Sequence, residues 1–271
     1  MRNDDRHDCR AAALIAPVVL AAFIVSSCGG GPAPLTFPSS PFIPSIPGGA
    51  CGPIGPAIVN GSACSITANT SVVLVNVRDS DGSLGSCSGT IIAPRAVLTA
   101  AHCLTGGDIT VRIFFGTGPP IVASALFASP DYREYDPNAL DVGVLLFDQD
   151  LGRPPMPVLL SRDARVGENA VIAGWGTSQD TSTATLRAGL TSIAAVGATR
   201  LQTQSSPTNA AVCAGDSGGP LLLSEGGVWA VAGITSAVHG LCTTGTDFYA
   251  NVRNPSIMSF ILSHVPDARR V

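Results

Sequence analysis

Short apolar runs rich in Val and Ile recur between residues 72 and 235, and Gly, Pro, Asp or Ser separate them. β-Branched residues such as Val and Ile favour strands, whereas Gly, Pro, Asp and Ser favour turns. The clearest runs cover residues 72–77, 90–92, 96–100, 109–115, 121–127, 142–147, 170–174, 220–223 and 228–235. This pattern predicts an all-β fold made of many short strands.

A helical spacing of apolar residues occurs only near the C-terminus. The apolar residues there recur at helical spacing: Ile257, Phe260, Ile261 and Val265. Pro255 suits the first turn of a helix. We therefore predict a C-terminal α-helix over about residues 255–265.

Residues 1–27 have the features of an export signal. Residues 11–25 are continuously apolar, and this run is too short for a membrane span, which needs about 20 residues. The small residues before Cys28 resemble the bacterial lipobox, in which the signal is cut before a Cys that carries lipid. The resemblance implies lipidation at Cys28 and a cell-envelope lipoprotein. An ordinary signal of a secreted, extracellular protein is the alternative, and an uncleaved anchor is a third hypothesis.

The next segment, residues 28–57, is rich in Gly, Pro and Ser and is almost uncharged. It has no helix or strand periodicity, so we predict a semi-extended spacer and propeptide. Such a spacer would hold the folded domain, residues 58–271, away from a membrane.

Composition excludes several classes of protein. Hydrophobic residues make up 45% of the chain and charged residues 13%, which is unlike a disordered chain. The net charge is −4 and there is no basic stripe, so we expect no nucleic-acid partner. The eight Cys are widely spaced without C-x-x-C pairs, which favours disulfides in an oxidising compartment. No metal or cofactor is predicted, because His7, His239 and His264 have no partnered acidic or Cys cluster.

Three motifs stand in the order His, Asp, Ser: TAAHC at 99–103, DVGVLL at 141–146 and GDSGGP at 215–220. Each alone has a structural explanation, but together they resemble the trypsin and chymotrypsin family of serine proteases. The resemblance implies a catalytic triad of His102, Asp141 and Ser217 that hydrolyses peptide bonds. A Ser hydroxyl needs a base, His can accept its proton, and a buried carboxylate orients the His ring.

The resemblance also implies a fold. The family has two six-stranded antiparallel β-barrels, here at about 58–160 and 161–254, followed by the helix. The triad would lie in the cleft between the barrels. The backbone N–H groups of Gly215 and Ser217 would form the oxyanion hole, in a turn that excludes Cβ atoms.

The sequence IVNG at residues 58–61 resembles the activation sequence of the family. It implies a zymogen that an activating protease cuts between Ala57 and Ile58. The new amine of Ile58 would then pair with Asp216 and form the oxyanion hole and specificity pocket. Ala57 at the cut argues against autoactivation by an Arg-specific enzyme.

By the same resemblance, Ser236 bonds the triad Asp and is one of four substrate-binding positions, with Ala211, Val238 and Asp247. Ala211 replaces the Asp of trypsin-like members, which argues against plain trypsin specificity. Val238 replaces a wall Gly, in a segment that departs from the usual Trp-Gly, and makes the pocket shallow. Asp247 takes a second pocket position, where it could pair with a basic side chain or stay protonated. We expect small or medium apolar residues before the scissile bond first, and basic residues second.

The family implies two disulfides, Cys87–Cys103 beside the catalytic His and Cys213–Cys242 across the specificity pocket. Its usual partner for the Cys at position 64 is missing, because Ala188 lies near that place. We therefore pair Cys51 with Cys64, which would tether the cut protease to its spacer. Two free thiols are the alternative.

Two other functions compete with a protease. A catalytically silent, protease-like binding or adhesion module at the cell surface is favoured only by the unusual segment at 237–238. An esterase would carry its nucleophile in G-x-S-x-G on an α/β fold, whose βα alternation is missing here. We expect a monomer whose partners are a protein or peptide substrate and an activating protease, with membrane contact only through Cys28.

Overall fold

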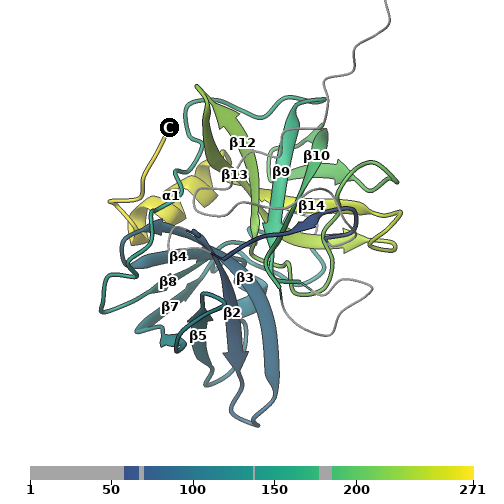
Figure 1. The fold of residues 1–271 in the computed structure, drawn as a ribbon. Helices are drawn as coiled ribbons and strands as arrows, with labels where there is room; N and C mark the ends of the chain where they lie inside the picture. The colour runs from purple at the N-terminus through teal and green to yellow at the C-terminus, as the bar shows by residue number, and fades with distance from the viewer. Residues whose placement is uncertain (1–57, 67–69, 137, 177–184) are drawn as a thin grey trace, which may run out of the picture. The chain divides into compact units, whose positions relative to one another are not determined.

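The computed structural model describes residues 58–66, 70–136, 138–176 and 185–271. The predicted export signal, the lipidation site Cys28, the spacer and Cys51 lie outside the described residues. The described part is mostly β and forms two antiparallel sheets, with one α-helix near its C-terminal end (Figure 1).

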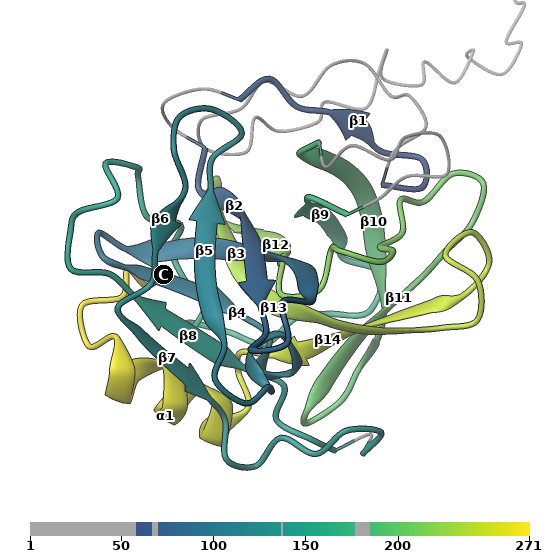
Figure 2. The ribbon, with the colours of Figure 1, turned by 90° about the horizontal axis from the view of Figure 1, so that it is seen from below.

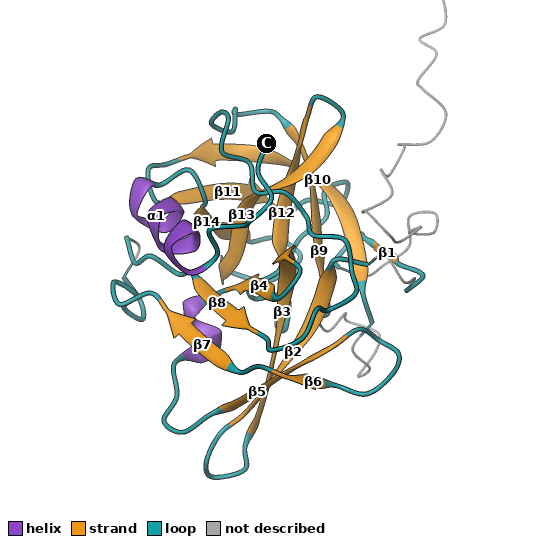
Figure 3. Cartoon of the chain, turned by 90° about the vertical axis from the view of Figure 1, so that its left-hand side faces the viewer, coloured by secondary structure: helices purple, strands orange, loops and turns teal. Residues whose placement is uncertain are grey.

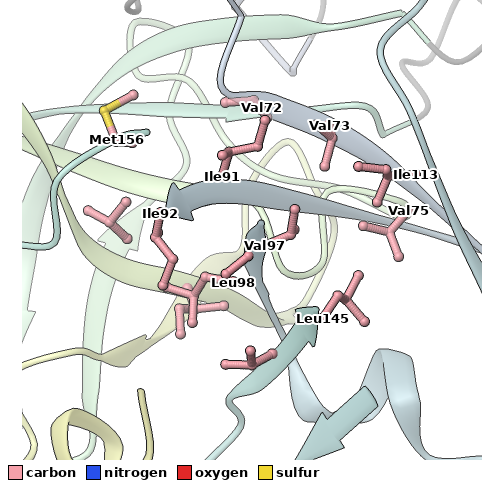
Figure 4. Close-up of a cluster of buried hydrophobic side chains, with 14 of the residues drawn as sticks. Val72, Val73, Val75, Ile91, Ile92, Val97, Leu98, Ile113, Leu145 and Met156 are labelled. Carbon is pink, nitrogen blue, oxygen red and sulfur yellow. The ribbon is translucent and has the colours of Figure 1, made fainter. Parts of the chain in front are cut away.

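The first sheet is an open, curled half-barrel with the strand order β6-β5-β2-β3-β4-β8-β7 (Figure 2). Its strands are β2 (Val72–Arg78), β3 (Leu84–Ala93), β4 (Ala96–Thr99), β5 (Thr110–Phe114), β6 (Ile121–Val122), β7 (Ala125–Ala128) and β8 (Gly143–Leu146). Val72, Ile91, Val97, Ile113 and Leu145 from five of these strands are fully buried in one cluster (Figure 4). β-Branched side chains fill most of this interior, as the sequence pattern predicted.

The second sheet closes into a ring, because β9 pairs with both β10 and β12. The ring runs β9-β10-β11-β14-β13-β12, and β1 is added to it through β10. Its strands are β1 (Ser62–Ala63), β9 (Asn169–Gly174), β10 (Arg187–Val196), β11 (Arg200–Gln204), β12 (Pro220–Glu225), β13 (Val228–His239) and β14 (Thr246–Asn251). The predicted all-β fold with two barrel-like halves is confirmed. One half is a closed six-stranded barrel and the other a half-barrel.

The first described residues belong to the second sheet. Val59 forms a bridge with Ala211, and Ser62 in β1 lies opposite Ala188 in β10. The side chain of Ile58 is 3% exposed and packs in the core of the second sheet. The first sheet therefore begins at β2, whereas the first barrel was predicted to begin at about residue 58.

The C-terminal helix α1 (Pro255–His264) is close to the predicted range (Figure 3), and its last residue contacts β7. The rings of His264 and Phe127 lie 4.3 Å apart. The side chain of Asn254 caps the helix by accepting hydrogen bonds from the Ser256 and Ile257 amides, at 3.0 and 3.2 Å. Within the described ranges, no helix has both the length and the apolar character needed to cross a bilayer.

Replacing Asn254 by Ala should lower the free energy of unfolding by about 1 kcal/mol, because the first amides of α1 lose their acceptor. Asn254→Asp keeps an oxygen acceptor and should cost much less. Urea unfolding of both variants measures the difference. Equal losses would show that the cap contributes nothing.

Candidate active site

Two neighbouring strands of the first sheet bring His102 and Asp141 together. His102 lies in a short 3₁₀ helix (Ala101–Leu104) directly after β4, and Asp141 lies just before β8. Thr99 in β4 is paired with Gly143 in β8, so the register sets the two side chains side by side. His102 Nδ1 lies 2.8 Å from one Asp141 carboxylate oxygen, and the His102 backbone N–H donates to the other at 3.0 Å.

The second sheet supplies a third donor to this carboxylate. Ser236 in β13 donates its hydroxyl to Asp141 at 2.6 Å. Asp141 is buried, and burial alone would raise its pKa. The hydrogen bonds and charge of His102 and the bond from Ser236 outweigh burial and hold the pKa of Asp141 below its ordinary value. The carboxylate is therefore ionised at neutral pH and fixes the orientation of the His102 ring.

Ser217 lies in a tight loop just before β12. Asp216 N–H donates to Cys213 O at 3.1 Å, and Gly219 N–H donates to Asp216 O at 2.9 Å. Gly215 has φ +91° and Gly218 has φ +80°, a region that favours glycine. Among the described residues, neither the Gly215 nor the Ser217 N–H donates a hydrogen bond. Both amides are thus available to an external acceptor.

Sequence reasoning missed Ser88, which ties this loop to the first sheet. The Ser88 N–H donates to Ser217 O at 2.7 Å, and its hydroxyl donates to Gly215 O at 2.9 Å. The hydroxyl also accepts from the Trp175 N–H at 2.8 Å. The only local signal for Ser88 was its place next to Cys87, because its partners lie far away in the sequence.

The Cys87–Cys103 disulfide joins the residue before Ser88 to the residue after His102. Cys103 Sγ is 3.9 Å from Ser217 O, so the Ser217 backbone lies beside the residue that follows His102. Within the described part of the chain, the Ser217 hydroxyl makes no hydrogen bond with His102. Such bonds are often long when no substrate is bound.

Both disulfides implied by the family resemblance are present, Cys87–Cys103 and Cys213–Cys242. Cys64 is also in a disulfide, and its predicted partner Cys51 lies outside the described residues. The sulfurs of Cys87 and Cys103 lie within 4.8 Å of a His102 ring nitrogen. Since both sulfurs are oxidised, this group offers no thiolate to a metal ion.

The carboxylate of Asp216 is buried and lies close to Gly174 at the end of β9. It accepts the Gly176 and Cys213 amides at 2.8 and 2.9 Å. Burial raises the pKa of Asp216 to about 6, and these bonds and the charge of Arg187 oppose that rise. A Cβ at Gly174 would lie 2.3 Å from an Asp216 oxygen, so the backbone of β9 packs closely against this carboxylate.

The predicted pocket residues converge at one end of the second sheet. Val238 in β13 lies opposite Asp247 in β14. Val238 also packs on the core of the second sheet, which contains the two residues on either side of Ala211, Ala210 and Val212. Asp247 is fully buried, and one of its oxygens accepts from Thr203 at 3.1 Å. Burial raises the pKa of Asp247 to about 7. Its other oxygen has no hydrogen-bond partner among the described residues.

A cleft of about 740 Å³ opens beside the His102–Asp141 pair. One wall is the edge of β13 from Ser236 to His239, and the other is the loop at residues 132–136. The Tyr132 ring lies 6.4 Å from the His102 ring. The cleft is large enough for several residues of an extended peptide that adds to the β13 edge.

This fold and site define a chymotrypsin-like protein. The sequence pattern of the family called Trypsin matches residues 58–261, and the chain therefore belongs to that family. The membership supports a serine protease.

Relatives of known function agree with this assignment. A chymotrypsin of Phaedon cochleariae is 26% identical over 208 residues, covering 66% of this chain and 70% of that protein. Trypsin beta of Drosophila erecta is 26% identical over 222 residues, covering 72% and 84%. The solved structure of HL collagenase superposes with a TM-score of 0.65 at 21% identity, covering 76% of this chain and 98% of the other. That last likeness shows the fold alone.

Replacing Gly218 by Ala should lower the free energy of unfolding. The loss should be well above the roughly 1–2 kcal/mol that a non-glycine residue costs in the left-handed region. Its Cβ would lie 2.2 Å from the Thr99 hydroxyl and 2.4 Å from Ser88 O. Gly227→Ala is the matched control, because Gly227 has φ +82° but open space around it. Equal losses in urea unfolding would contradict the close packing of the Ser217 loop.

Proposed function

We propose that the protein is a serine endopeptidase, made as a zymogen that is cut before Ile58. The observation that carries the proposal is the buried Asp141 carboxylate, which holds the His102 ring at 2.8 Å in a cleft sized for a peptide. The Gly-rich loop that carries Ser217 supports it, because two of its amides have no acceptor among the described residues.

In this mechanism the Ser217 oxygen attacks the peptide carbonyl carbon while His102 takes the hydroxyl proton. The amides of Gly215 and Ser217 stabilise the oxyanion that forms. His102 then gives its proton to the leaving amine, and an acyl-enzyme remains on Ser217. Water attacks this ester with His102 as base, which releases the acid and restores the Ser217 hydroxyl. Asp141 stays ionised throughout and stabilises the protonated ring.

Activation would proceed through Ile58 and Asp216. The Ile58 side chain is already in the core of the second sheet, so cutting before it would place a new ammonium within that sheet. A buried carboxylate such as Asp216 is stabilised by a positive partner.

The disulfides support export, because such bonds persist in oxidising compartments. We further propose lipid attachment at Cys28, and a Cys51–Cys64 bond that keeps the cut protease joined to its spacer.

For the residue before the scissile bond we propose a small or medium apolar side chain. Val238 packs over the core where the pocket would deepen. Asp247 lies opposite Val238 and is fully buried, so a long basic side chain reaches it only if Val238 is removed.

The cut full-length chain should react with a fluorophosphonate probe and hydrolyse peptides. Ser217→Ala should abolish labelling, and Asp141→Asn should lower kcat by about 10⁴-fold because the His102 ring loses its orientation. Ser263→Ala on the exposed side of α1 is the matched control and should leave both unchanged. A folded, cut chain that does not label would sink the protease proposal and favour a silent binding module at the cell surface.

Val238→Gly should shift specificity toward Arg and Lys. We expect kcat/KM for an Arg substrate, relative to an Ala substrate, to rise about 10- to 100-fold, or roughly 1.4–2.7 kcal/mol. The ratio should increase as the pH rises through about 7, because Asp247 is neutral below its pKa and attracts a cation above it.

Adding Asp247→Asn should remove both the gain and its pH dependence. A gain that survives in the double variant would show that Asp247 does not contact the substrate.

A further inference from the structure

Two arginines lie on the outer face of the first sheet without a partner. Arg78 ends β2 and Arg112 lies in the middle of β5, and both side chains are exposed. Within the described ranges, neither guanidinium forms a hydrogen bond, an ion pair or a ring contact. Both positive charges are therefore available to an external anion, although the whole chain has a net charge of −4.

The strand register places the two arginines side by side on this face (Figure 2). Arg112 is paired with Asn76, which lies two residues before Arg78 in β2, so the arginines occupy diagonal positions of one strand pair. Such positions are roughly 7–8 Å apart, within reach of long side chains. The buried Val111 and Ile113 alternate with Arg112, so the arginines point away from the core. Two like charges so close repel each other, and an anion bound between them removes that repulsion.

A groove of about 280 Å³ runs along the same face, and we call it the arginine groove because both arginines line it. Leu84 in β3, opposite Arg78, also lines it and is 72% exposed. None of the lining residues is acidic. The neighbouring carboxylates of Asp79 and Asp81 accept hydrogen bonds from adjacent backbone amides instead. An acidic peptide segment fits this groove, since its carboxylates can pair with the planar guanidinium groups.

The arginine groove adjoins the proposed catalytic site. A pocket of about 300 Å³ lies beside His102, at the Cys87–Cys103 disulfide. This pocket shares Leu84 and Ser86 with the arginine groove, and it shares His102 with the cleft along β13. A peptide whose acyl part adds to the β13 edge would run past His102 into this pocket. The part after the scissile bond would then reach the arginine groove.

We propose that the arginine groove docks an acidic segment of a protein substrate, several residues after the scissile bond. This rests on the proposed protease function and deepens it by naming a class of substrate. Asp79 lines the pocket between His102 and the groove, so it disfavours an acidic residue directly after the scissile bond. Docking takes place away from the reacting atoms and should therefore lower KM and leave kcat nearly unchanged.

The test uses the full-length chain with a protease recognition sequence in place of residues 53–57, cut before Ile58. Two fluorogenic peptides share an Ala before the scissile bond and carry an extension of about ten residues after it, or roughly 33 Å when extended. The distal half of the extension is rich in Glu in one peptide and in Gln in the other. We expect kcat/KM to be about three- to tenfold higher for the Glu peptide, through KM, and the preference to fade in high salt.

The variant that carries both Arg78→Gln and Arg112→Gln should lose this preference. The variant with Arg78→Glu and Arg112→Glu should prefer a Lys-rich extension over the Gln-rich one. Arg95→Gln is the matched control, because Arg95 is exposed in the turn after β3, at the other end of that strand from Leu84, and it should keep the wild-type preference. The readout is a ratio between two peptides, so a general loss of activity in a variant cancels.

Equal kcat/KM for the two peptides in the wild-type chain would overturn the role of the arginine groove and leave the protease function standing. A preference that persists in the double Gln variant would have the same meaning. A cut wild-type chain that cleaves neither peptide would overturn the protease function, and the substrate role of the groove with it.

Binding to the cut Ser217→Ala chain, which should not hydrolyse the peptides, is measured by fluorescence anisotropy. The Glu peptide should bind more tightly than the Gln peptide, and the double Gln variant should remove the difference. A chain that binds a sulfated polysaccharide through these arginines but does not distinguish the two peptides would have a polyanion site there, which contradicts the proposal.

Discussion

The buried Asp141 carboxylate is the group on which the two halves of the site depend. Its donors come from the first sheet through His102 and from the second through Ser236. An ionised carboxylate is tolerated in this place only if those donors are present, since its burial is otherwise unfavourable. The two sheets must therefore pack in one relative position for the carboxylate to keep its hydrogen bonds. That position also sets the direction of the His102 ring.

Ser88 makes a second connection between the sheets, and it acts on backbone rather than on charge. Its amide and hydroxyl bind the carbonyls of Ser217 and Gly215. With those carbonyls occupied by Ser88, the loop keeps the conformation in which Gly215 and Gly218 have positive φ. The position of Ser217 thus depends on a strand of the opposite sheet, and the site forms only when both sheets are folded together.

Local motifs in the sequence predicted the protease family, the strand-rich class and the C-terminal helix. They did not predict which segments pair across the chain. β10 was missed because small residues such as Gly189 give no apolar pattern. Gly189 must be small, because a Cβ there would lie 2.3 Å from Ala210. β11 and β14 were missed for a related reason, since Thr203 and Asp247 turn polar groups into the barrel.

The role of Ser88 was hidden in the same way. It is an ordinary residue type whose partners are distant in sequence, so no spacing rule marks it. The assignment of β1 to the second sheet depends likewise on its pairing with β10. Motif reasoning found the residues proposed to touch substrate, whereas the residues that hold them in place needed the fold.

The second barrel buries two carboxylates, Asp216 and Asp247, whose charges affect each other. Adjacent backbone amides, of Val212 and Cys213, bind Asp247 and Asp216 respectively. The negative charge of Asp216 adds to burial in raising the pKa of Asp247. In the proposed zymogen, the ammonium that a cut before Ile58 frees would weaken this repulsion and favour ionised Asp247. The proposed activation would therefore also change the charge at the base of the predicted pocket.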